Sequence, residues 1–157
     1  MSWIEEELEE IKLQKDQKEA AREWSLHKAE ILRSKSLQIW CSVMEQVKAD
    51  VAFLVSTYKR EVEFIEVPAR TLTVKNNSRP TVEVTASIRL DGRMIDLKTR
   101  EVQVPLGFTE EKTDIISVDI DENENVQFSY FGRCFDSLED VSRLILAPIL
   151  KAYRASR

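Results

Sequence analysis

Glycine and proline are scarce in this 157-residue chain, which contains three glycines and four prolines. So few glycines exclude a glycine-rich loop that cradles phosphate groups, and the shortage of both residues excludes a low-complexity linker. Residues 2–65 contain neither residue, so this segment has no strong helix breaker.

Cysteines and long apolar runs are also rare. Cys41 and Cys134 are the only cysteines, too few for a disulfide scaffold and typical of a reducing compartment. No apolar run reaches the ~18 residues that a membrane span needs. The N-terminus, MSWIEEELEE, is acidic where a secretion signal is basic. We therefore predict a cytoplasmic protein without a membrane partner.

The chain also lacks the excess of basic residues typical of nucleic-acid binding, since its net charge is −5. The charge is unevenly distributed. Residues 70–100 carry seven basic and three acidic side chains, whereas residues 101–125 carry one basic and eight acidic side chains. Such a dipolar surface is compatible with oriented self-association or with simple local pairing. We predict no nucleic-acid partner.

Residues for catalysis or tight metal binding are few. The single histidine, His27, lies among charged residues and is predicted to be on the surface. Arg133 precedes Cys134 and would favour its thiolate, but no base accompanies it, so a small buried side chain is expected. We predict that the protein is not an enzyme and has no cofactor and no metal site.

Residues 119–125 resemble a calcium loop because oxygen-bearing side chains alternate there, at Asp119, Asp121, Asn123 and Asn125. An EF-hand requires glycine at its sixth position and glutamate at its twelfth, and these positions hold Glu124 and Tyr130. The segment is therefore predicted to be a polar turn.

Residues 2–65 are predicted to be helical because they are rich in Glu, Lys, Leu, Ala and Gln. Ser2 and Glu5 have the spacing of a capping box. A single helix of ~60 residues would be ~90 Å long. We therefore predict either one projecting helix or a helical hairpin that breaks near Ser34–Ser36. The second half carries a heptad-like stripe suited to covering a sheet: Trp40, Met44, Val47, Val51, Leu54 and Tyr58.

From Leu72 onward apolar and polar residues alternate, which predicts strands. Asp91-Gly92 predicts a two-residue type I′ turn between two of them. That turn pairs Ile88 with Ile95, Ala86 with Leu97, and Glu83 with Arg100. Later, the faces of residues 116–120 and 126–130 match only if their loop has an odd length of three or five residues.

The C-terminal segment is predicted to be a helix that starts after Asp136-Ser137 and is kinked or split at Pro148. Its expected buried face is Leu138, Val141, Leu144, Ile145 and Ile149. The predicted fold class is α+β: a long N-terminal helical region, an antiparallel meander of about five strands, and a C-terminal helix on one sheet face. Residues 1–65 would form a helical arm or hairpin, and residues 66–157 the sheet and last helix, joined with the second half of the arm.

Several apolar residues in the first half of the helical region have no evident partner in the same chain. We predict that they form the interface of a homodimer, with contributions from Ile4, Leu8, Ile11, Trp24 and Ile31. A hairpin at Ser34–Ser36 would instead bury them internally, and this alternative stays open.

The predicted function is that of a non-catalytic protein–protein interaction module (an adaptor, chaperone-like or regulatory protein) that self-associates through its N-terminal helices. The alternative is a binder of a small hydrophobic ligand, with a pocket between the sheet and the C-terminal helix. Aromatic residues available to line such a pocket are Phe108, Phe128, Tyr130, Phe131 and Phe135.

Overall fold

The computed structural model describes residues 2–68, 70–77, 81–103 and 108–155. Along the chain, one helix precedes seven consecutive strands and a second helix follows them. Their bounds are α1 Trp3–Tyr58, β1 Val62–Val67, β2 Thr71–Asn76, β3 Thr81–Ile88, β4 Met94–Gln103, β5 Phe108–Ile120, β6 Val126–Tyr130, β7 Arg133–Phe135 and α2 Leu138–Ala155. The α+β fold class is confirmed.

Helix α1 runs without interruption for 56 residues, so the N-terminal region is one helix and not a hairpin. Both bonds of the predicted capping box at Ser2 and Glu5 form. At the expected break, the hydroxyls of Ser34 and Ser36 donate to the carbonyl oxygens of Ile31 and Arg33, at 2.9 and 3.0 Å. These serines bond back onto the preceding turn of the helix, which accommodates them without a break.

The strands form one antiparallel sheet in the order β1-β2-β3-β4-β5-β6-β7. The expectation of about five strands is wrong, because β1 and β7 were not anticipated. Most side chains of β1 are exposed and its sequence continues directly from the helix, so no clear alternation marks it. Strand β7 is only three residues long, which is too short for a period of two to be visible.

The predicted register of the β3–β4 hairpin is confirmed: Ile88 pairs with Ile95, Ala86 with Leu97, and Glu83 with Arg100. The predicted two-residue turn is wrong. The strands are joined through Arg89–Arg93, where the carbonyl of Arg89 accepts from the N–H of Gly92 at 2.9 Å.

Within this loop, every residue of which is described, Gly92 alone has a positive φ, of 72°. A type I′ turn needs positive φ at both central residues, so the loop is a longer turn of another type. The register is nevertheless the predicted one, because the N–H of Arg89 still donates to the carbonyl of Met94, the pair that follows Ile88 and Ile95 in the same register. The β5–β6 loop has five residues between Ile120 and Val126, as its parity predicted.

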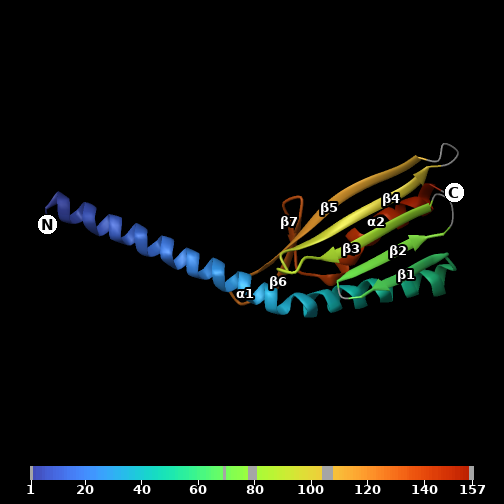
Figure 1. The fold of residues 1–157 in the computed structure, drawn as a ribbon, viewed down its shortest axis with the longest axis horizontal. Helices are drawn as coiled ribbons and strands as arrows, with labels where there is room; N and C mark the ends of the chain where they lie inside the picture. The colour runs from blue at the N-terminus through green and yellow to red at the C-terminus, as the bar shows by residue number, and fades with distance from the viewer. Residues whose placement is uncertain (1, 69, 78–80, 104–107, 156–157) are drawn as a thin grey trace.

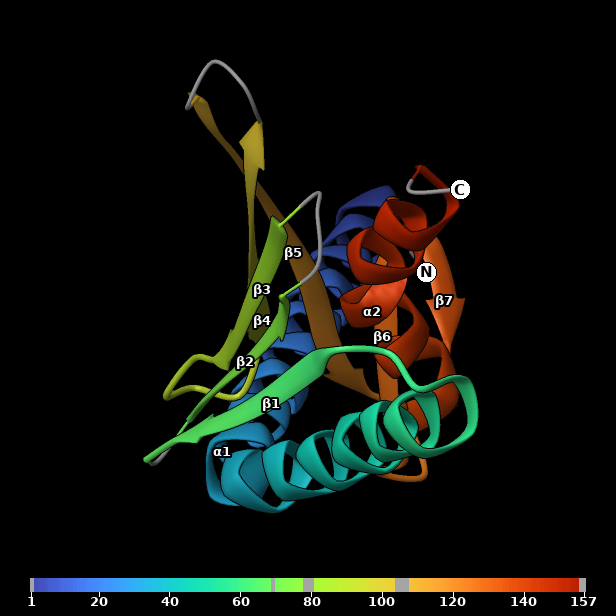
Figure 2. The ribbon, with the colours of Figure 1, turned by 90° about the vertical axis from the view of Figure 1, so that its right-hand side faces the viewer.

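The core lies on the concave side of the sheet. Figure 2 shows the strands curving around α2, while the second half of α1 runs beneath it. Alternate residues of β2 to β5 point inward, with Leu72, Val84, Ile95 and Ile116 almost fully buried. Val43 and Val47 of α1 and Val141, Ile145 and Ile149 of α2 complete this layer. The last helix therefore fills the hollow of the sheet, and α1 closes its open side.

The predicted buried face of α2 is confirmed, with Leu138 and Leu144 partly buried and the other three residues fully buried. The helix continues through Pro148, so a split at this residue is wrong. Ile145 and Ile149 pack into the same core on either side of the proline, so tertiary packing stabilises the helix across it. A buried polar contact also joins the helices: the hydroxyl of Ser142 donates to a carboxylate oxygen of Asp50 at 2.6 Å.

Candidate functional site

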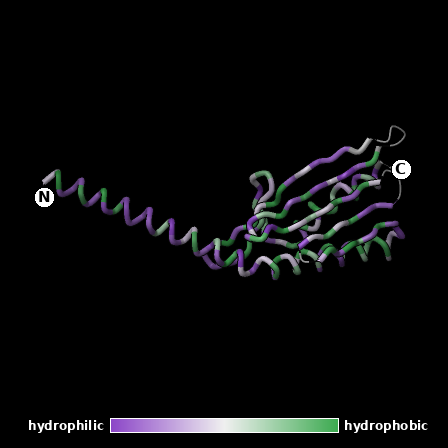
Figure 3. The backbone as a smooth tube through the Cα atoms, viewed as in Figure 1, coloured by the Kyte–Doolittle hydropathy of each residue, from purple (hydrophilic) through white to green (hydrophobic). Residues whose placement is uncertain are grey.

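The first half of α1 projects away from the sheet as an arm, defined here as residues 3–27 (Figure 1). At 1.5 Å per residue the arm reaches about 37 Å. Every residue of the arm is classed as exposed, whereas buried positions on α1 begin at Leu32. Figure 3 shows isolated hydrophobic residues along this otherwise hydrophilic segment. The arm therefore offers a large surface that its own chain does not cover.

The base of the arm is fixed by the end of β5 and by the loop that follows it. Lys28 lies 3.1 Å from a carboxylate oxygen of Asp119, and the His27 ring lies 3.4 Å from a carboxylate oxygen of Glu124. The loop itself is held by Asp121, whose carboxylate accepts from the backbone N–H groups of Asn123 and Asn125. These bonds confirm the predicted polar turn. The arm consequently leaves the sheet in a direction set by several contacts.

A second support lies at the β3–β4 loop. Gly92 packs against the backbone of Leu32 so closely that a Cβ atom at this position would collide with the Leu32 carbonyl oxygen. Arg70 reaches the same region and donates to the hydroxyl of Ser36 at 3.1 Å. These two contacts hold the helix at the point where its buried half begins.

The predicted interface residues do not share one environment. Ile4, Leu8 and Ile11 are 52–59% exposed, whereas Trp24 is less accessible, at 36%. Ile31 is partly buried and packs against the core, so its own chain already covers part of it. On a helix of 3.6 residues per turn, Ile4 and Trp24 point about 160° apart. One apolar stripe therefore contains Ile4, Leu8 and Ile11, while Trp24 lies on the opposite side, next to His27 and Lys28.

The charges of the arm are divided along its length. Five glutamates lie between residues 5 and 10, with no basic residue among them. Four basic residues follow between residues 12 and 22, accompanied by Asp16 and Glu19: Lys12, Lys15, Lys18 and Arg22. The outer end of the arm is strongly negative and the inner part is weakly positive.

A cleft of about 650 Å³ opens between the sheet and α2. It exists because α2 packs mainly against β3 and α1, while the ends of β4 and β5 extend past it. Its apolar walls and charged rim are formed by Val82, Val84, Leu97, Thr99, Glu101, Glu110, Lys112, Asp114, Tyr130, Leu144, Ala147, Pro148, Lys151 and Ala152. The location agrees with the predicted alternative of a pocket between sheet and C-terminal helix.

The cleft contains one aromatic residue among the five that were expected to line it. The hydroxyl of Tyr130 donates to a carboxylate oxygen of Asp114 at 3.1 Å. Partial burial, together with this acceptor, raises the pKa of Tyr130. Phe128 is buried in the core, Phe131 and Phe135 border other hollows, and the Phe108 side chain lies outside the described residues. The cleft thus has aliphatic walls, a rim of charged residues and one aromatic side chain, that of Tyr130.

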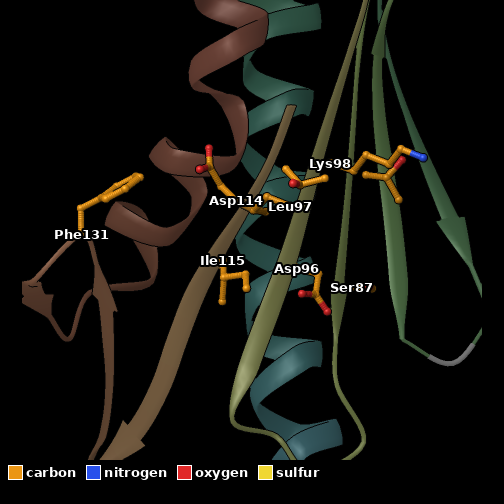
Figure 4. A pocket seen from close by; sticks show the side chains of 9 residues that line it. Ser87, Asp96, Leu97, Lys98, Asp114, Ile115 and Phe131 are labelled. Carbon is orange, nitrogen blue, oxygen red and sulfur yellow. The ribbon is translucent and has the colours of Figure 1, made fainter. Parts of the chain in front are cut away.

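Another hollow, of about 680 Å³, lies against the outer face of the sheet (Figure 4). Figure 4 shows Phe131 extending toward it from the β6–β7 turn, with Asp96 and Ser87 on the far side. Its charged groups already have partners, because Arg89 binds Asp96 at 2.9 Å and Lys98 lies 3.6 Å from Glu111. The pairing of Arg89 with Asp96 raises the pKa of Arg89. This hollow is a shallow, electrostatically satisfied surface.

Other predicted features were located as follows. His27 is on the surface, as expected. Cys134 is exposed, so its predicted burial is wrong; it lies on the short edge strand β7, whose three residues are all accessible at least in part. Among the described residues no cluster of His, Cys, Asp or Glu could hold a metal ion. No described helix has the length and apolarity to cross a membrane.

Comparisons with protein-family models, with curated proteins and with solved structures found no match to this chain.

Proposed function

We propose that this protein is a non-catalytic interaction module that self-associates through its projecting arm. The observation that carries the proposal is the exposed stripe of Ile4, Leu8 and Ile11 on a helix that extends beyond the fold. Burying a large apolar side chain contributes roughly 1.5–3 kcal/mol. Because the three residues are spaced by four and three, a helix of a second copy can cover all of them at once.

A dimer also accounts for the helicity of the arm. An isolated helix of this length is marginal in water, since most helical stability comes from packing of an apolar face. The base contacts at Lys28 and Asp119 hold only the inner end. A partner helix would order the outer end and cover the apolar stripe. Whether the dimer acts as an adaptor, a chaperone-like protein or a regulator would then depend on the further protein that it binds.

Light scattering coupled to size exclusion tests the proposal. A mass near twice 18.2 kDa is expected at micromolar concentration. Leu8→Lys should return the protein to the monomer mass, because it places a charge in the apolar stripe. The matched control is Leu90→Lys, at a residue of the β3–β4 loop that is 73% exposed. A monomer for the unaltered chain, or equal effects of both substitutions, would contradict self-association through the arm.

A second function is favoured by the cleft beside α2, which matches the volume of small-molecule sites. We propose as the alternative that this cleft binds a small hydrophobic ligand, with Tyr130 and Asp114 at its polar end. The probe is 1-anilinonaphthalene-8-sulfonate, whose fluorescence rises on transfer to an apolar site. Ala147→Trp should fill the cleft and abolish the signal, whereas Ala49→Trp, on an exposed face of α1, should preserve it. Equal signals from both variants would contradict this alternative.

A further inference from the structure

The apolar stripe of the arm continues as a basic one. After Ile4, Leu8 and Ile11, the same alternating steps of four and three residues lead to Lys15, Lys18 and Arg22. Because α1 is one unbroken helix, these six residues lie along one face of it. All six are exposed. The face therefore has an apolar outer half and an inner half of long, basic side chains.

We infer that two copies of the chain pair their arms in an antiparallel orientation, centred near residue 13. The inference rests on the proposed self-association and adds its direction and register. In this register Ile4 lies opposite Arg22 of the second copy, Leu8 opposite Lys18, and Ile11 opposite Lys15. Long basic side chains cover apolar neighbours with their methylene groups and keep their charged ends in water. Each half of the face therefore complements the other half.

The charges flanking the face favour the same orientation. Antiparallel pairing sets the block of five glutamates, residues 5–10, opposite residues 16–21 of the second copy. That segment contains Lys18 together with Asp16 and Glu19, and it is flanked by Lys15 and Arg22. Parallel pairing would set glutamates against glutamates and would stack Lys15, Lys18 and Arg22 on their own copies. Like charges at such close positions are destabilising, and opposite charges fix the register of an interface.

The length of the arm also permits this arrangement. Paired segments from residue 4 to residue 22 end before His27 and Lys28, where the helix contacts the end of β5 and the β5–β6 loop. The two sheets would lie at opposite ends of the paired arms, on either side of a two-fold axis. Such an axis makes the contact self-complementary and closed, so the assembly stops at two copies.

Cysteine cross-linking tests the orientation. Both native cysteines are exposed and are first replaced by serine. Single cysteines are then introduced by Gln14→Cys, Glu7→Cys and Ala21→Cys, all at equivalent positions flanking the paired face. With a short bismaleimide, Gln14→Cys should cross-link to its own copy. Glu7→Cys alone should not, since antiparallel pairing separates the two copies of residue 7 by about 18 Å along the helix axis. A mixture of Glu7→Cys and Ala21→Cys should cross-link between the two variants.

Each outcome has a distinct meaning. A dimer whose Glu7→Cys variant cross-links with itself overturns the antiparallel orientation but leaves self-association intact. A dimer without any of these cross-links shows that the arms are not the paired elements. A monomer by light scattering overturns the proposed function itself, before orientation is considered.

A charge substitution provides an independent measurement. Lys18→Glu should raise the dimer dissociation constant at least tenfold at low salt, because glutamate would then face the negative outer end of the partner arm. Lys48→Glu, at an exposed position on the second half of α1, is the matched control and should leave the constant unchanged. If Lys18→Glu has no effect, or strengthens the dimer, the antiparallel pairing is wrong.

Discussion

The two halves of α1 belong to one helix but have opposite environments. In the second half, Trp40, Val43 and Val47 are 0–1% exposed beneath the sheet and against α2. In the first half, Ile4, Leu8 and Ile11 remain more than half exposed on the arm. The backbone is equally helical in both, since neither half contains glycine or proline.

The comparison separates two properties of a helix: the propensity that makes its backbone helical, and the apolar face that determines what it packs against. Intrinsic propensity explains why the backbone is helical throughout, but it differs little between the halves. The width of the apolar face is the difference. The second half of α1 has seven buried residues, which form a broad surface: Leu32, Ser36, Ile39, Trp40, Val43, Val47 and Val51. The arm has only a narrow apolar stripe, which gives way to lysines. A broad face suits a sheet and a narrow one suits a single helix.

The largest expected contrast between the halves comes from their tryptophans. Trp40→Ala should lower the free energy of unfolding by about 3–5 kcal/mol, because the indole is fully buried in the core. Trp24→Ala should cost less than about 1 kcal/mol, since this ring is at the edge of the arm and partly in water. Urea unfolding followed by far-ultraviolet circular dichroism measures both. Similar losses would show that the arm belongs to the cooperative core.

The junction between the halves can be disturbed at Gly92. Gly92→Ala should destabilise the protein by about 2–4 kcal/mol, because it adds a collision with the Leu32 carbonyl to the strain of a positive φ. Gly132 also has a positive φ, of 77°, but a Cβ atom there meets open space. Gly132→Ala should therefore cost only about 1–2 kcal/mol. Thermal unfolding measures the loss of stability in both variants. A loss for Gly92→Ala no larger than that for Gly132→Ala would contradict the close contact with Leu32.

Two exposed alanines test whether the halves unfold together. Ala49→Gly should lower the unfolding free energy of the sheet and helices by about 1 kcal/mol, because glycine is a poor helix former. Ala20→Gly makes the same change on the arm and should leave that transition unchanged. It should instead reduce the helical signal of the arm. A decrease in core stability with Ala20→Gly would mean that the two halves are energetically coupled.

The smallest effect is expected at the loop that supports the base of the arm. Backbone N–H groups, first that of Asn125 and then that of Asn123, hold the pKa of Asp121 below its ordinary value. A lowered pKa in the folded state means that this contribution is complete above about pH 4 and is lost as the pH falls further. Asp121→Asn should thus reduce the difference in melting temperature between neutral and acidic pH. An unchanged difference would contradict the role of this carboxylate.

The sequence predicted those elements whose apolar and polar residues follow a regular pattern over many positions. Alternation located β2 to β6. The Asp91-Gly92 turn predicted the pairing of Ile88 with Ile95, and parity restricted the loop after Ile120 to three or five residues, of which the structure has five. Both predictions depend on which face of a strand is apolar, and the core requires that face to point inward. Ser2 and Glu5 similarly marked the start of α1, because a cap is a local interaction.

Features that depend on three-dimensional contacts were missed. The turn type at Gly92 is set by its packing on Leu32, a residue 60 positions away, and not by Asp91-Gly92 alone. The place of the cleft beside α2 was anticipated but its lining was not, because the lining depends on how far β4 and β5 extend past the helix. The extra length of β5, Phe108–Ile120, was hidden because its first half is rich in charged and polar residues.

The packing of α1 against α2 has a consequence for the order of folding. The seven strands are neighbours in the order of the chain, so hairpin after hairpin can form from local contacts. The core, in contrast, joins the first element of the chain to the last one. While the protein is being synthesised, the contacts between α1 and α2 therefore stay unformed until α2 has emerged from the ribosome. Closure of the core is then the final step, and part of the apolar surface of α1 stays exposed until it occurs.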